Sequence, residues 1–106
     1  MGFKAVMEID ELWDGQMRSV RMGTKKILVA KYEGKYFAYA DKCPHQGASL
    51  SDGIFERCFV TCAAHHWQFD VTTGCGVNPF GVELEGFPVK WDGDRIYVDV
   101  EVGNAP

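Results

Sequence analysis

Two short motifs near the middle of the chain restrict its fold more than any other feature of the sequence. They read CPH at residues 43–45 and CAAH at residues 62–65, with 16 residues between them. Each motif combines one thiolate with one imidazole, and ligands so close in sequence converge on one metal only where the backbone turns tightly. Pro44 and the two small alanines suit such turns. The sequence therefore predicts two facing loops that bring Cys43, His45, Cys62 and His65 to one metal centre.

Two kinds of metal centre fit two cysteines and two histidines. Zinc would bind all four side chains in one tetrahedral site. A [2Fe–2S] cluster would take both cysteines on one iron and both histidines on the other. Common zinc modules pair cysteine with cysteine and histidine with histidine, whereas each motif here mixes the two types. The mixed order favours the iron–sulfur cluster and leaves zinc as the alternative.

The segments on either side of the motifs have the pattern of short β-strands separated by glycine-centred turns. Strands are expected at residues 3–9, 16–22, 26–32 and 35–40, and again at 87–91 and 95–100. Residues 33–34 and 92–94 are hairpin turn sequences, and Asp10 is expected to cap one short helical turn that Gly15 ends. The pattern predicts an all-β fold, a small antiparallel sandwich or barrel.

Charge and composition exclude several classes of partner. The net charge of −4 at pH 7 opposes binding to nucleic acid, and no apolar run is long enough to span a bilayer. The first ten residues lack the basic region and long apolar core of a secretory signal. We therefore expect a cytoplasmic protein with no membrane partner. In that reducing compartment Cys58 and Cys75 are expected to be free thiols, although the sequence leaves a disulfide between them open.

The segments that carry the two motifs, DKCPHQGASLSDG and VTCAAHHWQFDVTTGCGVNP, resemble the cluster-binding loops of small Rieske-type [2Fe–2S] ferredoxins. The resemblance covers about the whole chain and implies a β-sandwich base with a smaller cluster-binding subdomain formed by two loops. It implies one [2Fe–2S] cluster held by Cys43, His45, Cys62 and His65. It also implies a single domain of residues 1–106, with the cluster-binding region inserted at about residues 41–81.

Within that family, CPHQ, CAAHHW and GVNP are more similar to the ferredoxin component of toluene or phenol-type aromatic monooxygenases. The resemblance implies a one-electron carrier rather than an enzyme. Its expected partners are a flavin-containing NADH oxidoreductase as donor and a di-iron hydroxylase as acceptor, bound transiently by a monomer. The alternative is the ferredoxin of an aromatic-ring dioxygenase, in which CTH and CSLH are more frequent. A small nitrite-reductase subunit and a zinc-stabilised binding module are further alternatives.

High-potential Rieske proteins of respiratory complexes carry an extra cysteine in each loop, and serine and tyrosine hydroxyls after the second histidine. In this sequence the positions that correspond to the extra cysteines look like Ala48 and Ala64. Those that correspond to the hydroxyl-bearing residues look like Trp67 and Phe69, so both features are absent. Fewer donors to the cluster stabilise its reduced form less, so we expect a midpoint potential in the low part of the Rieske range. Trp67 is expected to pack beside the cluster, with a place at a docking surface as the alternative. Pro79 is the candidate for shielding the cluster from water, and a purely structural role in its loop is the alternative.

His66 directly follows the expected ligand His65. Neighbouring side chains of an extended backbone point to opposite faces. His66 is therefore expected to point away from the metal, as an ordinary histidine at the surface or near the ligands, with a docking or proton-coupling role as the alternative.

Overall fold

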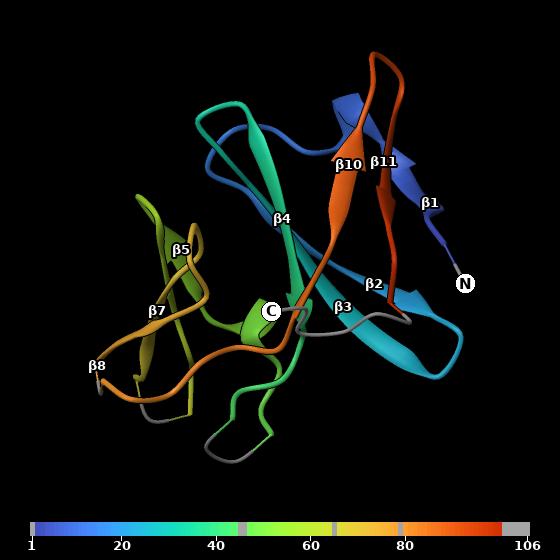
Figure 1. Ribbon diagram of the computed structural model, residues 1–106. Helices are drawn as coiled ribbons and strands as arrows, with labels where there is room; N and C mark the ends of the chain where they lie inside the picture. The colour runs from blue at the N-terminus through green and yellow to red at the C-terminus, as the bar shows by residue number, and fades with distance from the viewer. Residues whose placement is uncertain (1, 45–46, 65, 79, 101–106) are drawn as a thin grey trace.

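The computed structural model describes residues 2–44, 47–64, 66–78 and 80–100, and these residues form short antiparallel strands with two single-turn 3-10 helices. The strands make three sheets, of order β1-β11-β10, β2-β3-β4-β9 and β5-β6-β7-β8 (Figure 1). The first two sheets are built from β1 (Lys4–Glu8), β2 (Met17–Met22), β3 (Lys25–Tyr32), β4 (Lys35–Ala40), β9 (Gly86–Phe87), β10 (Val89–Trp91) and β11 (Arg95–Val98). The third contains β5 (Ile54–Glu56), β6 (Phe59–Thr61), β7 (Gln68–Asp70) and β8 (Gly76–Asn78). The expected all-β antiparallel fold is confirmed.

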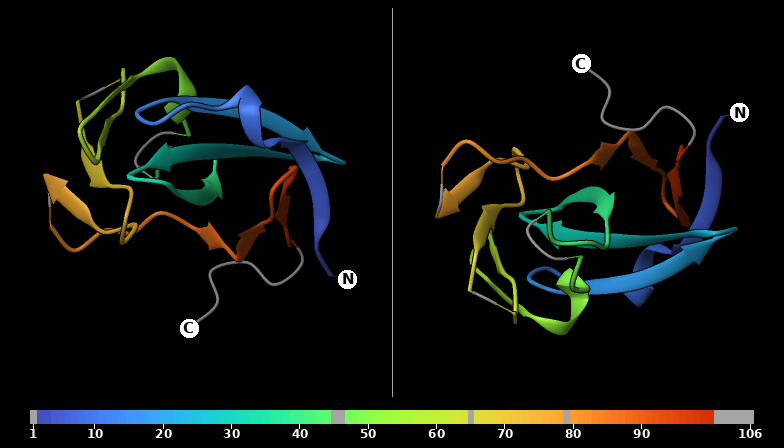
Figure 2. Two further views of the ribbon diagram at one scale, coloured as in Figure 1. Left: turned by 90° about the horizontal axis from the view of Figure 1, so that it is seen from above. Right: turned by 90° about the horizontal axis from the view of Figure 1, so that it is seen from below.

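The first two sheets pack against each other as a sandwich, and the third lies to one side of it (Figure 2). Apolar side chains from both sheets fill the sandwich, with Met7 and Ile96 from one sheet and Ile27, Val29 and Phe87 from the other. This core is separate from a second cluster of buried side chains that joins the sandwich to the third sheet.

The strand β3 is buried on both faces. Ile27 and Val29 point into the sandwich, whereas Leu28 and Ala30 belong to the second cluster. Because side chains alternate between the faces of a strand, an unbroken apolar run is what a strand between two cores requires. The run at residues 27–30 therefore holds the third sheet on the back of the sandwich.

Both expected hairpins are present. Glu33 and Gly34 join β3 to β4 with positive φ angles of 51° and 78°, as a tight two-residue turn requires. The turn at 92–94 joins β10 to β11, and the Asp92 carboxylate accepts hydrogen bonds from the backbone N–H groups of Asp94 and Arg95. These bonds, that of Arg95 first, lower the pKa of Asp92.

The strand expected at residues 87–91 is in fact two strands. It divides at Pro88, so that β9 pairs with β4 and β10 pairs with β11. Proline has no N–H to donate to a ladder, so a strand commonly breaks there. The break lets one segment belong to both sheets of the sandwich.

The expected helical turn after β1 is present, but its cap was predicted wrongly. The 3-10 helix η1 spans Ile9–Glu11, so Asp10 lies inside it and Gly15 lies beyond its end. The backbone N–H of Glu8 donates to the Glu11 carboxylate at 3.0 Å, which satisfies the start of the turn in place of an aspartate cap. Among the described residues, no helix has the length and apolar character needed to cross a bilayer.

Candidate metal centre

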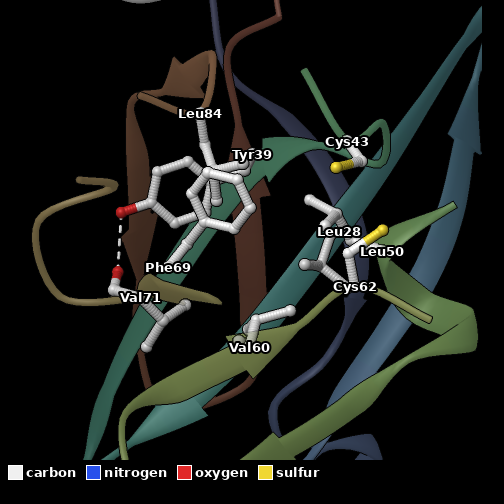
Figure 3. Close-up of a cluster of buried hydrophobic side chains, with 10 residues drawn as sticks. Leu28, Tyr39, Cys43, Leu50, Val60, Cys62, Phe69, Val71 and Leu84 are labelled. Atoms are coloured by element: carbon white, nitrogen blue, oxygen red, sulfur yellow. Dashed lines mark hydrogen bonds between the residues drawn. The ribbon is translucent and has the colours of Figure 1, made fainter. Parts of the chain in front are cut away.

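The two cysteines of the motifs lie together in the second apolar cluster. Cys43 follows β4 and Cys62 directly follows β6, and their side chains are only 2% and 1% exposed. Figure 3 shows both sulfur atoms at one end of the cluster, beside Leu28 and Leu50. The two expected histidine ligands, at positions 45 and 65, lie outside the described residues.

The first motif starts a loop that closes on itself. The backbone N–H of Cys43 donates to the Ala48 carbonyl at 2.7 Å, and the N–H of Gly47 donates to the Cys43 carbonyl at 2.8 Å. Gly47 has a φ of 76°, a left-handed conformation that glycine adopts without strain. The loop therefore returns to its starting residue within six positions.

The second motif forms a loop with the same closure. The N–H of Cys62 donates to the Trp67 carbonyl at 2.7 Å, and the N–H of His66 donates to the Cys62 carbonyl at 2.9 Å. His66 takes the place of Gly47, with a φ of 60°. The extended backbone expected at His66 was therefore wrong, because His66 closes a tight turn in a left-handed conformation. Its expected position at the surface is confirmed, since its side chain is exposed.

The two loops contact each other through Gly53. The first loop is followed by the 3-10 helix η2 (Leu50–Asp52) and then by Gly53. A Cβ at Gly53 would overlap the Thr61 carbonyl oxygen and would lie 3.3 Å from the Ala63 backbone nitrogen, at the start of the second loop. Only glycine allows the two backbones to approach so closely. No sequence signal predicts this contact, because the glycine follows an ordinary Ser-Asp pair.

The buried cysteines fit a metal centre chemically. The buried residues that pack together with them are apolar side chains and Tyr39. A thiolate placed there needs a cation, since an unpaired charge is strongly disfavoured in an apolar surrounding. Within the described ranges no three His, Cys, Asp or Glu side chains converge on one point. Cys43 and Cys62 are the part of the expected ligand set that these ranges contain.

Aromatic side chains close the apolar cluster around the cysteines. Phe69 is fully buried within it, and Trp67 is half-buried and packs against it. Trp67 therefore packs against the apolar side chains around the two cysteines, and its expected position beside the metal centre stays a prediction. Ala48 also contacts the cluster. Pro79, expected to act as a shield, lies outside the described residues.

Tyr39 connects the sandwich to this cluster. Its hydroxyl donates to the Val71 carbonyl at 2.6 Å (Figure 3), and Gly74 and Gly86 leave the space that its ring occupies. Burial raises the pKa of Tyr39, with a further contribution from the carboxylate of Asp70. The side chain is therefore a neutral hydrogen-bond donor at all ordinary pH values.

The remaining cysteines form no disulfide. The Cys58 carbonyl accepts a hydrogen bond from Val71, and the Cys75 carbonyl accepts one from Asp70, so the two cysteines flank β7 on opposite sides. Two strand spacings separate them by about 10 Å, beyond the reach of a disulfide. The expectation of free thiols at 58 and 75 is confirmed. Burial, and then Asp70, raise the pKa of the Cys58 thiol, which keeps it protonated and unreactive.

The segments that form the two loops and the stretch around Phe80 carry no charged side chains. Residues 43–48, 62–67 and 74–82 contain no Asp, Glu, Lys or Arg, although a quarter of the chain is charged. Phe80, in the segment after β8, is 85% exposed. It was not identified from the sequence, although an aromatic residue in a charge-free, proline- and glycine-containing loop was a usable signal.

Comparison with known proteins gives the same result for sequence and for structure. A model of the Rieske [2Fe-2S] domain matches residues 2–88. The ferredoxin component of the alkene monooxygenase system of Xanthobacter autotrophicus is 42% identical over 97 residues, which cover 91% of this chain and 80% of that protein. The ferredoxin component of biphenyl 2,3-dioxygenase of Rhodococcus jostii is 36% identical over 104 residues, 97% of each chain.

A solved structure described as the complex of reduced oxygenase and oxidized ferredoxin in carbazole 1,9a-dioxygenase contains a chain with the same fold. The two chains superpose with a TM-score of 0.81 and 30% sequence identity, over 91% of each.

Proposed function

The chain belongs to the Rieske [2Fe-2S] domain family, and from this premise we propose that it carries single electrons between the components of a hydrocarbon oxygenase system. It is a ferredoxin and not itself an oxygenase, since its relatives of similar length are named as ferredoxin components. The observation that carries the proposal is the pair of buried cysteines, each of which starts a loop that is closed by the same two backbone hydrogen bonds.

We propose that Cys43 and Cys62 bind one iron of a [2Fe–2S] cluster and that His45 and His65 bind the other. When bound, the cluster supplies a reversible one-electron couple. The chain's own residues exclude water from the sulfur side, where Leu28, Leu50 and Phe69 pack around the cysteines. In this proposal the whole chain acts as one domain, with residues 41–81 as the cluster-binding unit inserted into the sandwich.

The proposed electron acceptor is the di-iron hydroxylase of a toluene or phenol-type aromatic monooxygenase. The similarity to a monooxygenase ferredoxin supports this assignment, and the similarity to a biphenyl dioxygenase ferredoxin supports an aromatic-ring dioxygenase as the second candidate. The proposed donor is a flavin-containing reductase that uses NADH, which implies a cytoplasmic location.

The cluster and its ligands are tested by EPR of the dithionite-reduced protein, together with iron and sulfide analysis. We expect a rhombic signal with an average g value below that of an all-cysteine cluster. Cys43→Ala is expected to lose the signal, and the matched variant Cys58→Ala to keep it, because Cys58 lies in the turn at the opposite end of the β5–β6 hairpin from Cys62. A protein that contains zinc and gives no EPR signal would contradict the proposal.

The acceptor is tested with purified components. The reduced protein is mixed with a di-iron aromatic hydroxylase or with a Rieske-type ring dioxygenase, and its reoxidation is followed by stopped-flow absorbance. Faster electron transfer to the di-iron hydroxylase supports the monooxygenase assignment. The reverse order supports the dioxygenase assignment.

A further inference from the structure

Asp41 is a buried carboxylate at the entrance of the first loop. Its side chain is completely inaccessible to solvent. The carboxylate accepts a hydrogen bond from the Ser51 backbone N–H at 2.8 Å and a second from the Ser51 hydroxyl at 2.6 Å. A buried carboxylate is stable only when its oxygen atoms accept hydrogen bonds, so the two bonds from Ser51 fix the Asp41 side chain in this position.

The bonds between Asp41 and Ser51 join the two ends of the first loop. Asp41 stands two residues before Cys43, and Ser51 lies in η2, three residues after Ala48. The inner closure between Cys43 and Ala48 is thus enclosed by an outer one. Lys26 adds a link from β3, with its amine 2.7 Å from the Ser49 hydroxyl and 3.7 Å from the Asp41 carboxylate.

The same helix η2 carries this arrangement to the second loop. Ser51 lies in η2, and the N–H of Gly53 donates to the Leu50 carbonyl at 2.9 Å, which fixes Gly53 at the end of the helix. Gly53 contacts the backbone of Thr61 and Ala63. The position of the first loop relative to the second therefore depends on where Asp41 holds η2.

We propose that Asp41 and Ser51 form a positioning pair that sets the spacing of the two ligand loops, and through it the geometry of the metal ligands. The proposal rests on the ligand assignment made above. Neither side chain bonds the metal, so the pair acts through the backbone of the loops. Its removal must change the centre itself as well as the stability of the fold.

Ser51→Ala is the decisive variant, because it removes one hydrogen bond to the carboxylate without altering any charge. Ser51→Thr keeps the hydroxyl and serves as the rescue. Asp41→Asn keeps the size of the side chain and weakens both bonds. Asp92→Asn is the matched control, since Asp92 also accepts two hydrogen bonds, both from backbone N–H groups, but lies in the β10–β11 hairpin, at the opposite end of the molecule from the loops (Figure 1).

The readouts are the EPR line shape of the reduced protein and the rate at which the oxidised protein releases iron to a chelator. The loss of a hydrogen bond to a charged acceptor shifts the equilibrium between the closed and the open loops by on the order of tenfold or more. We expect Ser51→Ala and Asp41→Asn to release iron about tenfold faster, with broadened or shifted EPR lines. Ser51→Thr is expected to remain within about twofold of the wild type, and Asp92→Asn to match it.

Two results would overturn the proposal in different ways. Variants at 41 and 51 whose EPR line shape and iron release equal those of Asp92→Asn would reduce the pair to an ordinary part of the fold. If Ser51→Ala does not fold, Asp41→Asn and Ser51→Thr decide the question by the same two measurements. A wild-type protein without the mixed-ligand EPR signal would refute the proposed function, and the positioning role with it.

Discussion

Gly53 offers the sharpest test of how the two loops are held together. A Cβ at this position would overlap the Thr61 carbonyl oxygen and would lie 3.0 Å from the Thr61 carbonyl carbon. Both are backbone atoms of β6, which pairs with β5 immediately beyond Gly53. Gly53→Ala can therefore be accommodated only if the two loops move apart.

The expected cost of this substitution is large. Adding a methyl group to a well-packed site costs about 1–3 kcal/mol where side chains can adjust. Here no flexible side chain can give way, so we expect about 3 kcal/mol or more, a substantial part of the stability of a domain this size. Because the displaced backbone of Thr61 leads directly into the second loop, the metal centre is expected to change as well.

The assay compares urea unfolding and EPR of Gly53→Ala with those of Gly93→Ala. Gly93 has open space around its Cα and no positive φ, so its substitution is expected to change stability by less than about 0.5 kcal/mol. A Gly53→Ala protein with wild-type stability and an unaltered EPR spectrum would refute the reasoning, since it would show that the loops do not depend on this contact.

Three further predictions concern single side chains. Tyr39→Phe leaves the buried Val71 carbonyl without its donor and is expected to cost about 1–2 kcal/mol in urea unfolding. Because burial raises the pKa of Tyr39 above its usual 10.0, this contribution is fully present below pH 10.0 and is lost as the pH rises towards the raised pKa. His66→Val is expected to be about 1–2 kcal/mol less stable than His66→Gly, since a β-branched residue is strained at a φ of 60°. Phe80→Ser is expected to weaken binding to the oxygenase about tenfold, measured by calorimetry, and to leave stability unchanged.

Each of these predictions has a result that would contradict it. The stability difference between wild type and Tyr39→Phe must shrink above pH 10.0. A constant difference would contradict the claim that the buried, neutral Tyr39 hydroxyl stabilises the fold. Equal stability of His66→Val and His66→Gly would show that the left-handed turn is not required. For Phe80 the control is Trp13→Ser, which changes a side chain that is 69% exposed between η1 and β2. If both substitutions weaken binding equally, Phe80 is not a specific contact.

The sequence predicted the first four strands of the sandwich well because β1 to β4 are long enough to show a pattern. The residues at 33–34 and 92–94 are typical of the tight turns that join two strands of a hairpin. The apolar run at 27–30 marks a strand that is buried on both faces. The third sheet gave no such signal. Each of its four strands has three residues, too few for alternation to be distinguished from loop composition.

The sequence predicts ligand types for the site, and that prediction remains to be tested, but it does not predict the residues that support the loops. Cysteine and histidine at fixed spacing identify a metal centre because few other residues bind soft metals. Asp41 and Gly53 support the loops by burial and by close backbone approach, and neither property is visible in a single sequence. Their roles depend on Ser51, ten positions after Asp41, and on Thr61, eight positions after Gly53, and these residues meet only in the folded protein.

The shared closure of the two loops explains how motifs of different length serve one centre. In both loops the cysteine N–H bonds the carbonyl five residues later, and its carbonyl accepts from the residue four positions on. The closure uses backbone groups alone, so it leaves positions two and three after the cysteine available for a ligand. Histidine occupies the second position in one loop and the third in the other. What the closure demands is a left-handed residue at the fourth position, provided by Gly47 in one loop and at some strain by His66 in the other.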